Sequence, residues 1–165
     1  MGASQNFFEL TGSAAVTLTG LLFVVITLGA ERSRPGDEAL VRTFITPTFI
    51  HLSVVLVIAL LALSPEGDAL IPLYGLLGVV GLAYSLNIAR SAARSFGVFS
   101  HAWLFHGAIP IASYVSLMSL FAAWGGAMPI RYVDPILRMA SAVLLSVGMR
   151  NGWAVAVDIT RRKSN

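Results

Sequence analysis

The chain of 165 residues contains no cysteine. Disulfides, thiolate metal sites and cysteine nucleophiles are therefore excluded. Charge is also scarce, because only 12% of the residues are Asp, Glu, Lys or Arg, against about 25% in an ordinary soluble domain. A glycine-rich phosphate loop, a zinc-protease His-Glu pair and a serine elbow are missing as well. The sequence therefore predicts no catalytic residue, no metal site and no cofactor.

Long apolar runs fill most of the chain instead. They cover residues 10–30, 44–63, 69–89, 103–124 and 132–157, and hydrophobic residues make up 56% of the sequence. A helix of about 20 residues, at ~1.5 Å per residue, crosses a hydrocarbon layer of ~30 Å. The predicted fold class is therefore all-α: one integral membrane domain over residues 1–165, built as a bundle of five transmembrane helices.

Basic residues alternate between the connectors and predict an orientation. They follow the first run, the third run and the fifth run, as Arg32, Arg34, Arg42, Arg90, Arg94, Arg161, Arg162 and Lys163. The connector after the second run has none, and Arg131 and Arg138 are exceptions. Because Lys and Arg are retained on the cytoplasmic side, we expect the N-terminus outside and the C-terminus inside, in the cytoplasmic membrane of a prokaryote.

Several polar side chains fall inside the predicted spans. As candidates for a pathway or cavity we take Ser13, Thr17, His51, Asn87, His106, Arg150 and Asn151. Polar groups are costly in lipid, so such residues usually face the bundle interior, a cavity or a partner subunit. Other interpretations stay open: the hydroxyl groups can serve helix packing, and the Arg150 guanidinium can extend to the lipid headgroups.

Two of these candidates are histidines that depth along the predicted helices places in the same leaflet. Histidines from two helices can hold haem or a metal ion, but His51 and His106 share no ligand motif, so we expect no bound cofactor.

Arg150 has no acidic residue at matching depth on another predicted helix. A cavity that contained it would have positive potential and favour anions.

Small residues and charges at fixed spacing predict local structure. Gly75, Gly78 and Gly81 recur every third residue and indicate a close helix–helix contact, within the chain or between copies. Gly125-Gly126 is expected to end the fourth helix. Asp134 and Arg138 are spaced to pair on one helix face.

Three classes of function fit this pattern. The first is a homo-oligomeric channel or transporter for an anion or a small neutral solute, because one short chain does not easily enclose a pathway. The second is an accessory or scaffold subunit of a larger membrane complex. The third is a haem- or lipid-handling membrane enzyme. The expected partners are the lipid bilayer, further copies and other membrane proteins; nucleic acid is not expected, because the basic residues flank the spans.

Overall fold

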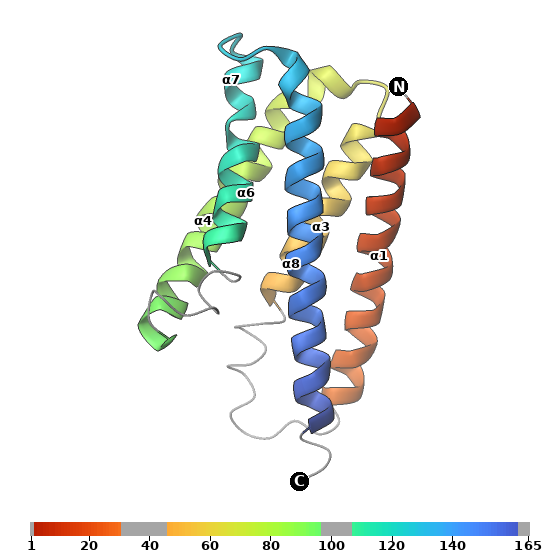
Figure 1. Cartoon of the computed structure of the whole chain (residues 1–165), viewed down its shortest axis with the longest axis vertical. Helices are drawn as coiled ribbons and strands as arrows, with labels where there is room; N and C mark the ends of the chain where they lie inside the picture. Colours follow the sequence, from red (N-terminus) through yellow and green to blue (C-terminus); the bar gives the residue numbers. More distant parts are fainter. Residues whose placement is uncertain (1, 31–45, 97–106, 162–165) are drawn as a thin grey trace.

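The computed structural model describes residues 2–30, 46–96 and 107–161, and all regular structure in these ranges is helical. Figure 1 shows the helices packed in alternating directions, with α1 and α8 extending along most of the molecule. The long elements are α1 (Gly2–Ala30), α3 (Thr46–Ala62), α4 (Ile71–Phe96), the pair α6 (Ile109–Met118) and α7 (Leu120–Trp124), and α8 (Val133–Arg161). Short 3₁₀ turns, η2 (Gly67–Leu70) and η4 (Ile130–Tyr132), precede α4 and α8.

Three stretches are long and apolar enough to cross a membrane. They are Gly2–Thr27, Ile71–Arg90 and Ile130–Ala154, while the apolar helices Thr46–Ala62 and Ile109–Trp124 are shorter. The all-helical class is thus confirmed, and the fold is compatible with a membrane protein. Five complete spans and their orientation remain predictions. Residues 44–45 and 103–106, where the second and fourth runs were expected to begin, lie outside the described residues.

The break between α6 and α7 follows from three serines. Ser113, Ser116 and Ser119 each donate a hydroxyl hydrogen bond to a backbone carbonyl three or four residues earlier, at 3.1, 2.7 and 2.6 Å. Such bonds compete with the helical ladder and bend helices. The α6 helix accordingly ends before Ser119, and α7 resumes directly after it.

The closest helix contact joins α4 to α6 and α7. A Cβ atom on Gly78 would lie 2.3 Å from the backbone nitrogen of Met118. A Cβ on Gly75 or Gly81 would collide with the ring of Phe121 or Tyr114. The predicted close contact therefore exists inside one chain. A side chain at Gly78 would meet the α6 backbone, whereas at Gly75 and Gly81 it would meet an aromatic ring.

Helix α8 holds the bundle together, because it packs against α1, α3 and α6. Its buried apolar side chains Leu137, Leu144 and Val147 join a core to which α3 contributes Val55 and Ile58. At about 25 cal/mol per Å² of apolar surface removed from solvent, such contacts favour a closed bundle in water. In lipid the same contacts act through close packing.

The end of the bundle near the N-terminus is tied by polar contacts. Asp134 and Arg138 form the predicted ion pair on α8, which confirms that expectation. The Ser4 hydroxyl of α1 also donates a hydrogen bond to Asp134. Gly125 and Gly126 end α7 as expected, and Gly126 has a φ of 76°, a left-handed conformation that suits glycine.

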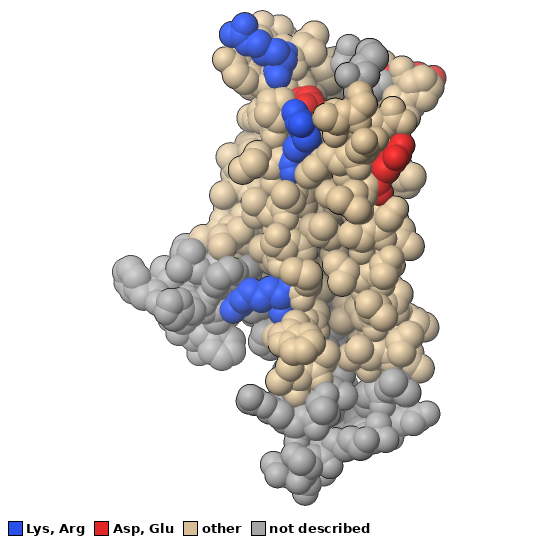
Figure 2. All heavy atoms as spheres, turned by 45° about the vertical axis from the view of Figure 1, so that its right-hand side comes forward, with Lys and Arg blue, Asp and Glu red and all other residues tan. Residues whose placement is uncertain are grey.

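The outer surface is predominantly apolar. Leu10, Phe23 and Met139 are each more than 60% exposed, and only 22% of the most apolar window of α1 is buried. Figure 2 shows a broad uncharged band, with most charged side chains of that face toward one end. Soluble monomers rarely expose continuous apolar patches of this kind, whereas a lipid-facing surface requires them.

Candidate functional site

A hydrogen bond between α3 and α6 lies deep in the bundle. His51 and Tyr114 are 2% and 0% exposed, and 2.8 Å separates the Nδ1 atom from the phenolic oxygen. Which group donates depends on the imidazole tautomer. The Tyr114 ring lies against α4 at Gly81, where a Cβ would approach its Cε1 atom to 2.1 Å. Gly81 thus makes room for a tyrosine that fixes the histidine ring.

Asn151 of α8 is a second buried polar group at the same level. Because α3 and α8 are antiparallel, Gly148 faces Leu52 and Gly152 faces Thr48. Asn151 therefore lies at the level of the α3 turn that contains Thr48 and His51. We call these four buried polar side chains, Thr48, His51, Tyr114 and Asn151, the polar layer.

The side-chain amide of Asn151 is the least satisfied group of this layer. The residue is 1% exposed, and neither its Oδ1 nor its Nδ2 has a hydrogen-bond partner among the described residues. Burial of an amide without compensation costs roughly 1–3 kcal/mol on the evidence of protein mutants. In native proteins, bound water or a ligand usually supplies the hydrogen bonds of such a group.

Two buried serines also have unpartnered hydroxyl oxygens in the described part of the chain. Ser85 lies one helical turn after Gly81 on α4, next to the level of Tyr114, and therefore borders the polar layer. Ser141 lies ten residues before Asn151 on α8, about 15 Å away along the axis. It belongs to the apolar half of the core.

The sequence-predicted candidates separate into two groups. His51 and Asn151 are buried and share the polar layer. Ser13 and Thr17 are exposed on α1, where the Thr17 hydroxyl donates to the Ser13 carbonyl at 2.9 Å. Asn87 is exposed on α4 and Arg150 on α8. His106 lies outside the described residues, so its predicted approach to His51 stays a prediction.

Tyr114 is the functional candidate that the sequence analysis missed. It lies in the middle of the predicted fourth span, between Ser113 and Ser116, and the sequence indicates no partner for its hydroxyl group. The glycine repeat was the available signal, because Gly81 provides the space that the ring occupies. Only the pairing of α4 with α6 shows which side chain uses it.

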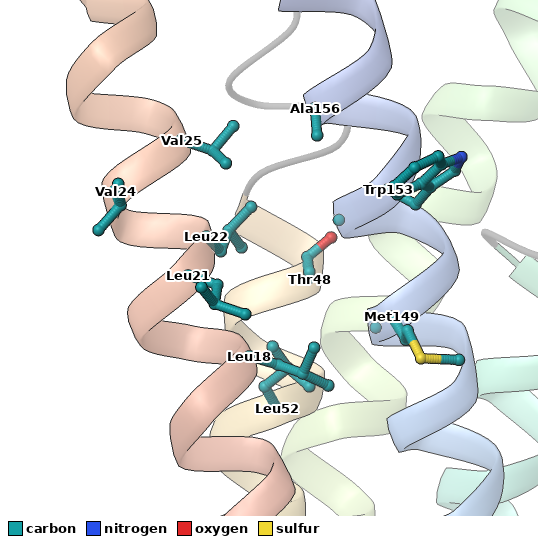
Figure 3. A pocket seen from close by; sticks show the side chains of 12 residues that line it. Leu18, Leu21, Leu22, Val24, Val25, Thr48, Leu52, Met149, Trp153 and Ala156 are labelled. Atoms are coloured by element: carbon teal, nitrogen blue, oxygen red, sulfur yellow. The ribbon is translucent and has the colours of Figure 1, made fainter.

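A crevice opens beside the polar layer, between α1 and α8 (Figure 3). Its volume is about 330 Å³. Leu18, Leu22 and Val25 line one side, and Met149 and Trp153 line the other. Thr48 lies among these apolar side chains. Since Thr48 belongs to the polar layer, the crevice leads from the exposed apolar surface to the level of that layer.

A second groove, of about 490 Å³, lies between α6 and α8. Its lining is Ile109, Ala142, Val143, Ser146, Val147 and Arg150. Arg150 therefore faces the side of the bundle. Among the described residues no group of three or more His, Asp or Glu side chains is placed to hold a metal ion.

No family model matches the chain, and no curated protein or solved structure is significantly similar to it.

Proposed function

We propose that the protein is a five-span membrane transport protein that passes or carries a small neutral solute through the polar layer. The observation that supports this most directly is the buried amide of Asn151, which offers one acceptor and two donors without a described partner. Selectivity in narrow membrane pathways depends on such donors and acceptors and on the width of the pathway.

A neutral solute suits the layer better than an anion. Its members offer hydroxyl, amide and imidazole groups, whereas Arg150 is exposed in the groove on the side of the bundle. An anion remains the alternative substrate if Arg150 faces a pathway between copies. We propose a homo-oligomer because a chain of this size has little room for a complete pathway of its own.

Flux measurements test this function. Vesicles that contain the purified protein should shrink and re-swell faster than protein-free vesicles in a urea or glycerol gradient, followed by stopped-flow light scattering. Tyr114→Phe removes the hydroxyl that holds His51 but keeps the ring over Gly81, so flux should fall while assembly is retained. Tyr132→Phe, at an exposed tyrosine, is the matched control and should behave as the wild type. Faster flux of chloride than of urea would favour the anion alternative.

An accessory subunit is the second candidate function, and the exposure of α1 favours it. Its surface combines large apolar residues with Ser13 and Thr17, a composition suited to a neighbouring transmembrane helix. An absence of flux for urea, glycerol and chloride, together with a partner protein that co-purifies in stoichiometric amount, would replace the transport proposal with this one.

The five-span topology has its own test. Because the chain has no native cysteine, single introduced cysteines report their location without background. With the N-terminus outside and the C-terminus inside, an impermeant thiol reagent on intact cells should label Gly67→Cys but not Ser164→Cys. Equal labelling at the two positions would rule out this topology, and labelling after cell lysis controls for accessibility.

A further inference from the structure

We propose that the crevice between α1 and α8 binds one acyl chain of a bilayer lipid. Twelve of the described residues line this space. None of the twelve is charged, and only Thr48 and Trp153 among them have nitrogen or oxygen atoms in their side chains. Spaces with apolar walls stay dry and take up apolar molecules instead of water. The inference rests on the proposed placement of the bundle in a bilayer, where hydrocarbon chains surround the crevice.

The two walls of the crevice run parallel and in register. At one end of the bundle, the Ser4 hydroxyl of α1 donates a hydrogen bond to Asp134 of α8. Leu22 and Gly152 each follow that contact by eighteen residues, and a Cβ atom on Gly152 would lie 4.0 Å from the Leu22 side chain. On α8 the lining extends from Gly148 to Ala156, so the crevice runs about 12 Å along the bundle axis.

The crevice is open because Gly152 has no side chain. A Cβ atom there would make only ordinary contacts, at 4.0 Å from the Leu22 Cδ1 atom and 4.0 Å from the Thr48 Cγ2 atom. A larger side chain would extend into the space between α1 and α8. At Gly148, by contrast, a Cβ would come within 2.8 Å of the Leu52 Cδ2 atom. The α3 helix therefore closes the crevice at Gly148, and the free space lies beside Gly152.

The depth and direction of the crevice suit a lipid chain. Ala156 follows Asp134 by twenty-two residues, or about 33 Å along α8. With a hydrocarbon layer of about 30 Å, the crevice begins at the second boundary and leads from there toward the centre of the bilayer. Trp153, which is 73% exposed, lies where an interfacial tryptophan is expected. An acyl chain of that leaflet begins at the same boundary and runs in the same direction.

The opening and the size of the crevice favour a single chain. Leu21 and Val24 of its lining are 58% and 52% exposed, so the crevice opens on the apolar surface of the bundle. Its volume of about 330 Å³ lies at the lower end of the range of roughly 300–1,000 Å³ for small-molecule sites. If it were unfilled, its walls would lose dispersion contacts. A flexible chain that enters from the side restores them and lies against Thr48, next to the polar layer.

Photolabelling in vesicles tests this inference. A phosphatidylcholine with a diazirine in the middle of one acyl chain is added in trace amount to vesicles that contain the purified protein. After illumination, adducts are located by peptide mass spectrometry. Adducts per residue on the crevice segments 18–25 and 148–156 should exceed those on the exposed apolar segment 73–80 of α4 about tenfold, which corresponds to ~1.4 kcal/mol.

Two variants locate the bound chain. Gly152→Leu fills the crevice, and Leu21→Trp covers it from an exposed position of α1 that does not depend on helix packing. Each should remove the excess of adducts and leave the labelling of α4 unchanged. Gly20→Leu is the matched control, because a Cβ at Gly20 would meet nothing within 4 Å, and it should keep the excess.

Two results would overturn the inference. One is an equal density of adducts on the crevice segments and on α4 in the wild type, which would indicate ordinary contact with surrounding lipid or a crevice filled by protein. The other is an excess that survives both Gly152→Leu and Leu21→Trp. A lack of adducts on α4 as well would contradict the bilayer placement itself, and the inference with it, so failure of the proposed function gives a different result.

Discussion

Gly78→Ala is expected to lower the thermal stability of the bundle, although alanine is the better helix former. The new Cβ would lie 2.3 Å from the Met118 nitrogen and 2.8 Å from the Leu117 carbonyl carbon. Both atoms belong to the α6 backbone and cannot rotate away, so α4 and α6 must separate. Overpacking of this kind costs about 1–3 kcal/mol, which exceeds the ~1 kcal/mol that the change from glycine to alanine contributes to helix propensity.

Gly20→Ala is the matched control. A Cβ at Gly20 of α1 would meet nothing within 4 Å, so this variant gains helix propensity without a collision. Melting followed by circular dichroism in one detergent should give a lower midpoint for Gly78→Ala and an unchanged or higher midpoint for Gly20→Ala. Equal midpoints for the two variants would mean that α4 and α6 do not approach as closely as the structure has them.

The sequence predicted where the helices lie along the chain better than it predicted which side of each helix faces the bundle interior. Long apolar runs specify a helical bundle because an unpaired backbone is too costly in lipid. They do not show which side of each helix points inward, because both the core and the lipid are apolar. Thr11 and Thr17 have similar surroundings in the sequence, yet Thr11 is buried and Thr17 is exposed.

In the candidate site, too, the sequence predicted the position of a residue along its helix but not the direction in which its side chain points. The sequence singled out His51 and Asn151 because polar groups in an apolar run need a reason. It also singled out Asn87 and Arg150 as pathway candidates, and the structure places both on the surface. Depth along each helix was predictable at ~1.5 Å per residue. Rotation about each helix axis was not, because it depends on contacts such as Gly148 with Leu52 and Gly81 with Tyr114.

The glycine repeat shows why the sequence alone does not identify the helix that packs against a given face. Spacing of three predicts a close contact for Gly75, Gly78 and Gly81, but the same small surface serves a contact within one chain or between copies. The structure assigns all three to α6 and α7 of the same chain. An oligomer interface, if the proposal of several copies holds, therefore has to use other surfaces, such as the exposed face of α1.

Asn151→Leu is expected to separate stability from function. Leucine has the same branched arrangement of side-chain heavy atoms as asparagine, with larger methyl groups and no polar atom, so it removes a buried amide that lacks a described partner. Relief of that desolvation should stabilise the empty protein by about 1–3 kcal/mol. The same change removes the donors and acceptor that we propose for solute binding, so flux of urea or glycerol in vesicles should fall to the protein-free rate while the melting temperature rises.

Asn87→Leu provides the matched comparison, since it makes the same chemical change at an exposed position of α4. It should neither raise the melting temperature by a comparable amount nor reduce flux. A lower melting temperature for Asn151→Leu would show that the amide is satisfied in the native protein, and unaltered flux would remove it from the pathway. A variant that is more stable but has lost flux is the result expected if Asn151 is kept for function. If the residue served only folding, replacing it with leucine would not raise the stability.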